Sequence, residues 1–331
     1  MAAIVTLTMN PALDLSTETE GLEPGHKSRC RSPRRSPGGG GINVARGLRV
    51  LGADVLAIYP SGGPTGAVCD RLLAELSVPM QTLPIGGDVR QNIALHVQDT
   101  DEVLHLVFPG PELDAGEWQA CLDAVGTLEP APDLLVLSGS LPPGVPEDFY
   151  ARAAERAAHR GSRVLLDTKG PALRAALDAR APLYLVKPNH RECRQLFDVP
   201  GDAPEDYLAT LDRLIADGVA RAFVVTLGAR GAVLASAEHR AHLRPPSVAG
   251  RAPVGAGDSF VAGLAHPASS PGSRTRRRHG RGGGAAPQRR PVSPAGPPKT
   301  AGARRGAPPA RLSADGFLSA AQPRADTNHA A

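Results

Sequence analysis

Residues 134–138 read LLVLS, residues 146–159 read PEDFYARAAERAAH, and residues 164–167 read VLLD. The first and third runs are short and apolar, which predicts strands, and the run between them has the apolar spacing of a helix. A strand, a helix and a second strand in this order predict a unit whose two strands lie parallel. Because these strands carry no polar alternation, we expect helices on both faces of the sheet. The stretch therefore predicts an α/β fold.

The same alternation continues on both sides of this stretch. Further strands are predicted at residues 4–7, 54–59, 183–187, 223–227 and 232–235. Further helices are predicted at residues 42–51, 67–76, 115–125, 171–179 and 203–217. Repeated units of this kind predict one mostly parallel central sheet with helices packed against it.

Two segments interrupt the alternation. Residues 13–35 lack helical spacing, and residues 91–108 alternate like a hairpin around the sequence DTD at 99–101. We expect the two segments to form a small antiparallel sheet outside the main one, which acts as a lid. Because an exposed sheet of this kind usually needs covering, we also expect a homodimer that forms through it.

The composition of the chain divides near residue 266. The whole chain carries 37 Lys and Arg against 33 Asp and Glu, a net charge of +4, but residues 267–331 hold 12 basic and only 2 acidic groups. Residues 1–266 therefore hold 25 basic and 31 acidic groups. Of the last 65 residues, 44 are Ala, Arg, Pro or Gly, a composition that cannot build a packed core. We predict one domain at 1–266, followed by a disordered, low-complexity basic tail at 267–331.

The basic pI of the chain does not indicate a nucleic-acid partner, because the positive excess lies entirely in that tail. The run RTRRRHGR at 274–281 could contact nucleic acid, but a solvated disordered segment is the commoner reading of such a run. No apolar stretch approaches the ~18–20 residues of a membrane span, and no signal-peptide pattern precedes the apolar residues 4–7. We therefore expect neither a nucleic-acid nor a membrane partner.

Cysteine usage favours a reducing compartment. The four cysteines are Cys30, Cys69, Cys121 and Cys193, and none forms a CxxC pair. Scattered cysteines of this kind predict free thiols and a cytoplasmic protein. His190 and Cys193 could ligate a metal, but without a second pair of ligands no zinc site is predicted there.

A first glycine cluster reads PGGGGINVAR at residues 37–46 and leads into a predicted helix. Glycines allow backbone N–H groups to approach a polar ligand closely, and Asn43 at the helix start can hydrogen-bond a hydroxyl. The cluster matches neither the Walker A pattern nor the dinucleotide fingerprint. A flexible turn is the structural alternative.

A second cluster reads VGAGDSF at residues 254–260. Small residues that open a helix leave its first N–H groups free to bind an anion, with the helix dipole behind them. Asp258 in such a place can take a proton from a hydroxyl while the N–H groups stabilise a transferring phosphoryl group. A plain helix-capping aspartate is the structural alternative.

Together the two clusters resemble the ribokinase-like carbohydrate kinases of the phosphofructokinase B type, in the branch of 6-phosphofructokinase isozyme 2, 1-phosphofructokinase and tagatose-6-phosphate kinase. The resemblance covers roughly residues 3–265. It rests on seven motifs in order: TLTMNPALD at 6–14, PGGGGINVAR at 37–46, RQN at 90–92, SGSLPPG at 138–144, VKPN at 186–189 with Glu192, VTLG at 225–228, and GAGDS at 255–259.

The resemblance implies a three-layer ribokinase-like sandwich with a small β-sheet lid, and an enzyme that uses ATP and Mg²⁺. It implies phosphorylation of a sugar phosphate, foremost fructose 6-phosphate to fructose 1,6-bisphosphate. The alternatives are 1-phosphofructokinase or tagatose-6-phosphate kinase activity, or a catalytically impaired relative.

The resemblance also implies roles for individual residues. Asp258 would be the catalytic base, with Gly255, Ala256 and Gly257 forming the anion hole. The substrate would contact Asp14, Gly39, Asn43 and Ser140, with Lys27, Arg29 and Arg90 suited to its phosphate. The nucleotide side would include Lys187, Asn189, Thr226, Gly228 and Gly231, and Asn189 and Glu192 would help to hold Mg²⁺.

The sequence departs from the family pattern at three places. His105 stands where an arginine is expected to touch the sugar phosphate, and Ala252–Pro253 replaces two residues that usually include hydroxyls. After residue 265, the tail replaces the helices with which the family continues. We interpret the tail as an out-of-frame translation of GC-rich DNA, a hypothesis that the other two forward frames of the gene test directly.

Overall fold

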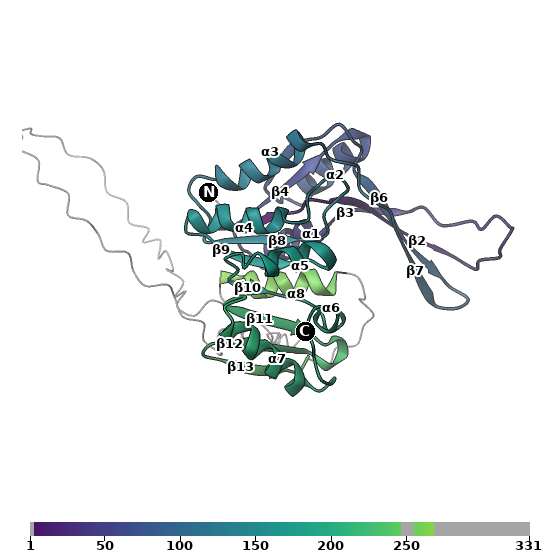
Figure 1. The fold of residues 1–331 in the computed structure, drawn as a ribbon. Coiled ribbons are helices and arrows are strands. Elements are labelled where there is room, and N and C mark those ends of the chain that lie inside the picture. The colour runs from purple at the N-terminus through teal and green to yellow at the C-terminus, as the bar shows by residue number, and fades with distance from the viewer. Residues whose placement is uncertain (1–2, 246–254, 268–331) are drawn as a thin grey trace, which may run out of the picture.

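A computed structural model describes residues 3–245 and 255–267 of the chain. Its centre is a nine-stranded sheet (Figure 1). In chain order its strands are β1 (Ile4–Leu7), β4 (Val55–Ser61), β5 (Met80–Pro84), β8 (Leu134–Ser138), β9 (Arg163–Asp167), β10 (Leu185–Val186), β11 (Ala222–Thr226), β12 (Ala232–Ser236) and β13 (Arg240–Leu243). Their order across the sheet is β13-β12-β11-β10-β9-β8-β1-β4-β5. The pairs from β11 to β5 are parallel, and β12 and β13 join antiparallel at one edge.

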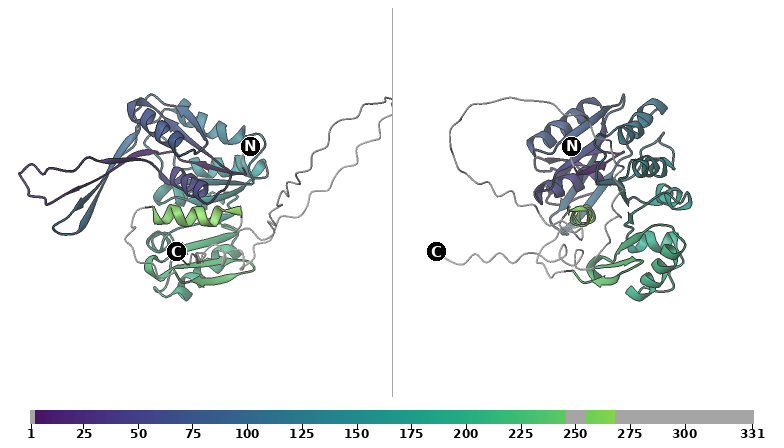
Figure 2. Two further views of the ribbon diagram at one scale, coloured as in Figure 1. Left: turned by 180° about the vertical axis from the view of Figure 1, so that it is seen from behind. Right: turned by 90° about the vertical axis from the view of Figure 1, so that its left-hand side faces the viewer.

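Helices cover both faces of this sheet, as the sequence predicts (Figure 2). One face carries α1 (Gly40–Val50), α2 (Gly63–Glu75) and α8 (Ala256–Ala265). The other carries α3 (Ala115–Gly126), α4 (Phe149–His159), α5 (Gly170–Asp178), α6 (His190–Leu196) and α7 (Pro204–Ala216). A short 3₁₀ turn, η1 (Gly228–Arg230), follows β11. The predicted three-layer α/β sandwich is confirmed.

The apolar run at 134–138 is explained by these two layers. Alternate residues of β8 enter different cores: Leu135 and Leu137 pack with α3 to α7, whereas Leu134 and Val136 pack with α1 and α8. Because side chains alternate across a strand, a strand that is buried on both faces must be apolar at every position. Burial on both faces is therefore the reason why the central strands could be recognised in the sequence.

A second, four-stranded sheet projects from the body as an arm (Figure 1). It contains β3 (Arg34–Gly38), β2 (Ala12–Thr19), β6 (Arg90–Val97) and β7 (Glu102–Val107), in that order across the sheet. We call it the arm sheet. The prediction that it is antiparallel is wrong for its middle pair, because β2 and β6 run parallel over eight residues. Both follow strands of the central sheet, β1 and β5, that already point the same way, so the chain enters the arm twice in one direction.

Several elements differ from the sequence prediction. Strands β5 and β13 and helix α6 were not predicted, and β10 has two residues where five were expected. Strand β5 is an edge strand with exposed positions, and α6 is only seven residues long, so neither carries a strong apolar period. Strand β13 and helix α6 each have one buried residue, so their composition gives little sign of them.

Other expectations concern residues outside the described ranges. The predicted disorder and shifted reading frame of the tail fall on residues 268–331, and the altered pair falls on residues 252–253. The cysteines Cys30, Cys69, Cys121 and Cys193 are free, as predicted. None of the helices in the described ranges combines the length and apolar character that a membrane crossing requires.

Candidate active site

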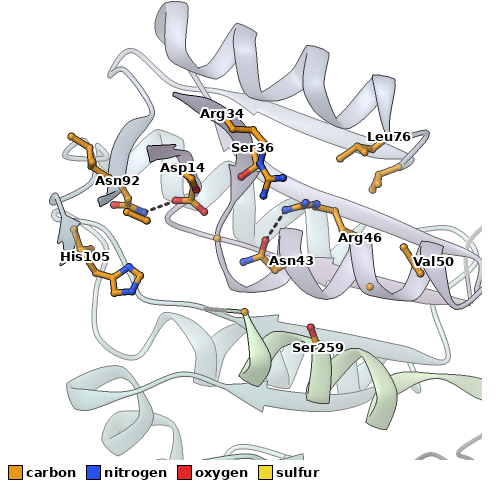
Figure 3. A pocket seen from close by; sticks show the side chains of 18 of the residues that line it. Asp14, Arg34, Ser36, Asn43, Arg46, Val50, Leu76, Asn92, His105 and Ser259 are labelled. Atoms are coloured by element: carbon orange, nitrogen blue, oxygen red, sulfur yellow. Dashed lines mark hydrogen bonds between the residues drawn. The ribbon is translucent and has the colours of Figure 1, made fainter. Parts of the chain in front are cut away.

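The arm sheet, helix α1 and the N-terminal end of α8 enclose a pocket of about 770 Å³ (Figure 3). Its walls come from β2, β3, β6 and β7 of the arm, from α1 along most of its length, from Leu76 and Val78 after α2, and from the N-terminal end of α8. Asp14, Gly39, Asn43, Gly255 and Ser259 all line it. The pocket therefore joins the two glycine clusters, which are more than 200 residues apart in the sequence.

Asp258 lies in the first turn of α8 and contacts α1. The Asn43 Nδ2 donates a hydrogen bond of 2.8 Å to Asp258 Oδ2. Burial raises the pKa of Asp258, while this hydrogen bond and the charge of Lys187 lower it. The carboxylate thus has a raised pKa and a fixed orientation, as a proton acceptor requires.

The N-terminus of α8 carries no side-chain cap. Gly255 precedes the helix in the left-handed conformation, with φ 79°, which a residue with a side chain adopts only with strain. The N–H groups of the first turn, including those of Ala256 and Gly257, have no partner within the helix. This geometry favours an anion at the helix end over the alternative of an ordinary capping aspartate.

The first glycine cluster packs closely against the ends of two central strands. Gly39, the residue before α1, has φ 111°, and a Cβ there would lie 2.7 Å from Thr8 Cγ2. A Cβ at Gly40 would lie 2.4 Å from Ser138 Oγ. Ser140, just beyond, accepts a 3.3 Å hydrogen bond from Asn10. The glycines are therefore required by close approach, which excludes a merely flexible turn.

Asp14 is held on the arm sheet. Its Oδ1 accepts a hydrogen bond of 2.9 Å from Asn92, its cross-strand neighbour on β6. On the other side, a Cβ at Gly38 would lie 2.0 Å from Asp14 Oδ2. Burial raises the pKa of Asp14, opposed by Asn92 and by the charges of Arg90 and Arg46. One carboxylate oxygen stays directed at the pocket beside the glycine loop.

The three cations predicted to bind the phosphate do not converge. The Arg90 guanidinium donates hydrogen bonds to the carbonyl oxygens of Phe108 and Asn10 at the base of the arm. Lys27 and Arg29 lie in the connection between β2 and β3 and line a separate hollow of about 480 Å³. Within one chain, Lys27 and Arg29 are absent from the lining of the Asp14 pocket, because β2 and β3 carry their connection away from it.

A buried ion pair lies beside the site. Lys187 Nζ is 2.9 Å from Asp167 Oδ1, and the two side chains are only 7% and 14% exposed. The pKa of Asp167 is raised to about 6. Burial is the largest cause, the charges of Asp258 and Glu192 add to it, and the neighbouring Lys187 opposes it. Lys187 is among the residues predicted from the sequence, whereas Asp167 is not. A polar residue at the end of the apolar run VLLD was the available signal.

Asn189 and Glu192, the predicted metal ligands, cap helix α6. The Asn189 Oδ1 accepts hydrogen bonds from the backbone N–H groups of Arg191 and Glu192, at 2.9 and 3.0 Å. Glu192 Oε2 accepts from the Asn189 N–H at 2.8 Å. The described residues contain no group of three or more His, Cys, Asp or Glu that could hold a metal ion.

The remaining nucleotide-side residues follow β11. Thr226 forms a parallel bridge with Asn189, and its N–H donates to Pro188 at 3.2 Å. Gly228 and Gly231 have positive φ, and a Cβ at Gly231 would lie 1.9 Å from the Leu243 carbonyl oxygen. These residues form a tight turn at the same edge of the sheet as Lys187.

The model of the pfkB family of carbohydrate kinases matches residues 2–275. The chain belongs to this family. The pfkB match confirms the resemblance predicted from the seven motifs, and it makes the protein a sugar-phosphate kinase.

Individual relatives agree with this assignment. The pfkB chain is 39% identical over 264 residues to the ATP-dependent 6-phosphofructokinase isozyme 2 of Mycobacterium tuberculosis, covering 79% of this chain and 76% of that protein. It is 37% identical to the 1-phosphofructokinase of Xanthomonas campestris, covering 79% and 82% of the two chains.

Solved structures of a third relative share the fold. The phosphofructokinase-2 of Escherichia coli in complex with fructose-6-phosphate matches with a TM-score of 0.75 and 38% identity, over 80% of this chain and 86% of that one. Another structure of the Escherichia coli enzyme is its tetrameric inhibited form, with the same TM-score and identity.

Proposed function

We propose that this pfkB kinase transfers the terminal phosphoryl group of ATP to fructose 6-phosphate, yielding fructose 1,6-bisphosphate and ADP. One observation carries the proposal. The Asp258 carboxylate is at an uncapped helix N-terminus and accepts a hydrogen bond of 2.8 Å from Asn43, which lines the same pocket as Asp14. The names of the Mycobacterium and Escherichia relatives support the choice of donor and acceptor.

Asp258 acts as the general base. The acceptor hydroxyl forms a bond to the γ-phosphorus, and the bond from that phosphorus to the bridging oxygen of ADP breaks. The hydroxyl proton passes to Asp258, whose raised pKa suits it to accept that proton. Asp14 and Asn43 hold sugar hydroxyls, and Gly39 lets the backbone approach them.

The helix end stabilises the group in transfer. The N–H groups of Gly255, Ala256 and Gly257 meet the negative charge on the phosphoryl oxygens, and the dipole of α8 acts in the same direction. In this type of reaction the protein contributes mainly positioning and electrostatic stabilisation. The buried Lys187 adds a positive charge that also lowers the pKa of Asp258.

The nucleotide lies along the ends of β10 and β11. Lys187, Thr226, Gly228 and Gly231 line its phosphates and base, with Asn189 at the turn between them. A bound Mg²⁺ would neutralise phosphate charge. The Asn189 oxygen already accepts two hydrogen bonds, so Glu192, which keeps Oε1 free of its cap, is the better ligand. This set fits a cation that takes most of its ligands from phosphates and water.

A second candidate acceptor is fructose 1-phosphate or tagatose 6-phosphate. The identity to the Xanthomonas 1-phosphofructokinase, 37% against 39%, favours keeping it. Sugar isomers differ by few contacts, so specificity of this kind rests on small differences in binding. A third candidate is an impaired relative, since the altered residues 252–253 and 268–331 precede and follow the catalytic helix.

The arm sheet is the proposed contact of a homodimer. Leu104 and Leu106 on β7 are 40% and 48% exposed, and all of β7 is exposed. An exposed apolar edge strand is a strong site for self-association. The tetrameric form of the Escherichia relative supports self-association within the family.

The kinase domain is proposed to span residues 1–266, with the basic tail following it.

The test is a panel of acceptors with purified protein, ATP and Mg²⁺, followed by coupled detection of ADP. Fructose 6-phosphate should give the highest kcat/KM, ahead of fructose 1-phosphate, tagatose 6-phosphate and fructose. A higher value for another sugar phosphate would replace the proposed acceptor. Binding of fructose 6-phosphate without turnover would identify the impaired relative.

A further inference from the structure

The pocket face of the arm sheet is built in rows that run across its four strands. Register places Ser36, Asp14, Asn92 and Val107 side by side in one row. Two residues farther along the strands, Arg34, Ser16, Ala94 and His105 form the next row, and all four line the pocket. We call these four residues the outer row. Successive residues alternate between faces, so the two rows share the face that meets the substrate.

The outer row has large polar ends and a small centre. Arg34 is on β3 and His105 on β7, the two outermost strands, with only Ser16 and Ala94 between them. At a strand spacing of about 4.8 Å, the two end backbones are separated by about 14 Å. Figure 3 shows Arg34 and His105 on different sides of the pocket, with Asp14 and Asn92 between them. The small residues leave a hollow that both ends can reach.

Arg34 differs from the other arginines of the site. The Arg46 guanidinium donates to the Pro37 carbonyl oxygen and to Asn43 Oδ1, at 2.8 and 3.2 Å. Arg90 is committed to two carbonyl oxygens. For the Arg34 guanidinium, the described part of the chain offers no hydrogen bond or ion pair. Arg34 therefore keeps all its donors for a ligand.

The charge of the pocket is out of balance. Its lining includes Arg34, Arg46 and Arg49 but only one carboxylate, Asp14, although residues 1–266 are acidic overall. Arg46 and Arg34 also repel each other. Burial lowers the pKa of Arg46, the charge of Asp14 raises it, and the charge of Arg34 lowers it further. An anion placed beside Arg34 relieves this repulsion, and a phosphate suits the guanidinium because it accepts two parallel hydrogen bonds.

We propose that Arg34 determines specificity for a phosphorylated acceptor by binding the phosphate over the outer row, opposite His105. This inference rests on the proposed function. Asn43, Gly255 and Ser259 line one end of the pocket and lie next to Asp258, which would accept the proton of the reacting hydroxyl. Asp14 would hold the sugar hydroxyls, and the outer row lies beyond Asp14 along the arm strands. Fructose 6-phosphate reacting at carbon 1 fits this order, since its phosphate and its reacting hydroxyl are at opposite ends.

The neighbouring residue supplies a matched control. Arg35 is also exposed and on β3, but it pairs with Leu15 in the row that faces the other way, and it does not line the pocket. Arg34→Gln and Arg35→Gln therefore remove the same charge from the same strand on opposite faces. Arg34→Lys keeps the charge and removes the two-pronged geometry.

The experiment measures binding of fructose 6-phosphate and of fructose by calorimetry, and kcat/KM for both acceptors. Arg34→Gln should weaken binding and kcat/KM for fructose 6-phosphate by about tenfold to a hundredfold and leave fructose unchanged. Arg34→Lys should fall between, and Arg35→Gln should stay within about twofold of the parent. Thermal unfolding of each variant reports whether the arm remains folded.

The outcomes separate the two proposals. Equal effects of Arg34→Gln and Arg35→Gln, or an equal loss for fructose and fructose 6-phosphate, would overturn the role of Arg34. If the parent protein phosphorylates no sugar phosphate, the proposed function fails, while the calorimetric comparison of the two variants still decides whether Arg34 binds the phosphate.

Discussion

The central sheet and the arm sheet are built in opposite ways. Strands β1 and β8 are buried at every position. The ion pair between Asp167, at the end of β9, and Lys187, just after β10, is buried as well. Strand β7 of the arm is exposed along its whole length, and its residues His105, Leu106 and Val107 line the pocket. From this difference we expect the central domain, including helix α8, to determine the reaction rate and the stability, and the arm to determine the affinity for the substrate.

The largest effect on turnover is expected from removing the proposed base, Asp258. Asp258→Asn should lower kcat by about 10²–10⁴-fold, because proton transfer loses its acceptor, while calorimetry should show little change in fructose 6-phosphate binding. Asp212→Asn, which alters an exposed ion pair with Arg240, is the control. Normal turnover by the Asp258→Asn variant would remove Asp258 from the mechanism.

A second test uses stability. Lys187→Met leaves Asp167 buried without its counter-ion, and we expect a loss of about 3–5 kcal/mol in the free energy of unfolding by urea. Arg240→Met breaks an exposed pair and should cost about 1 kcal/mol or less. Adding Asp167→Asn to Lys187→Met should recover part of the loss. Equal costs for the two pairs would contradict the view that burial makes the Lys187–Asp167 pair important for the stability of the central domain.

On the arm, a change that displaces Asp14 should alter the affinity for the sugar phosphate. Gly38→Ala places a methyl group where Asp14 Oδ2 lies, so the carboxylate must move. We expect KM for the sugar phosphate to rise roughly tenfold to a hundredfold, with a smaller change in kcat. Gly263→Ala, at a helical position with open space around it, should leave KM unchanged. A fall in kcat alone would assign Asp14 to the chemistry instead.

The pH dependence sharpens the role of the base. Burial raises the pKa of Asp258 above its usual 3.8, and Asn43 lowers it. Because the base must be ionised, kcat/KM should fall as the pH drops through this raised pKa. Asn43→Ala removes a hydrogen bond to the carboxylate and should move the acid limb to higher pH. A shift to lower pH would contradict the assignment.

The smallest effect is expected at the face of the arm. Leu104→Lys should weaken self-association, measured by light scattering after gel filtration, with little change in the unfolding temperature of the central domain. Leu51→Lys, at an exposed leucine on the body, is the control. An unchanged oligomeric state after Leu104→Lys would move the contact elsewhere.

How far the sequence predicted this molecule depended on burial. Strands such as Leu134–Ser138 are covered on both faces, and their continuous run of apolar residues made them recognisable in the sequence. The parallel pairing of β2 with β6 joins Asp14 to Asn92, 78 positions apart, and no local pattern records such a pairing. Edge strand β13 and the short helix α6 escaped prediction for the related reason that few of their side chains are buried.

The candidate site divides in the same way. Glycine positions were recognisable because close approach leaves no alternative residue, as at Gly39. Asp167 and Arg34 are single polar residues whose meaning comes from neighbours distant in sequence, Lys187 in one case and the outer row in the other. Lys27 and Arg29 were assigned from the family resemblance, and only the geometry of β2 and β3 shows that within one chain they line a different hollow.

The parallel pair β2–β6 also bears on how the protein folds. These strands are separated by the whole unit from β3 to β5, so they can meet only after that unit has closed a long loop. Contacts that are so distant in sequence form slowly, because the entropy of loop closure is lost before the contact contributes. We therefore expect the arm to assemble last, after the central sheet has taken shape. A newly made chain would then acquire its fold first, and its ability to select a substrate afterwards.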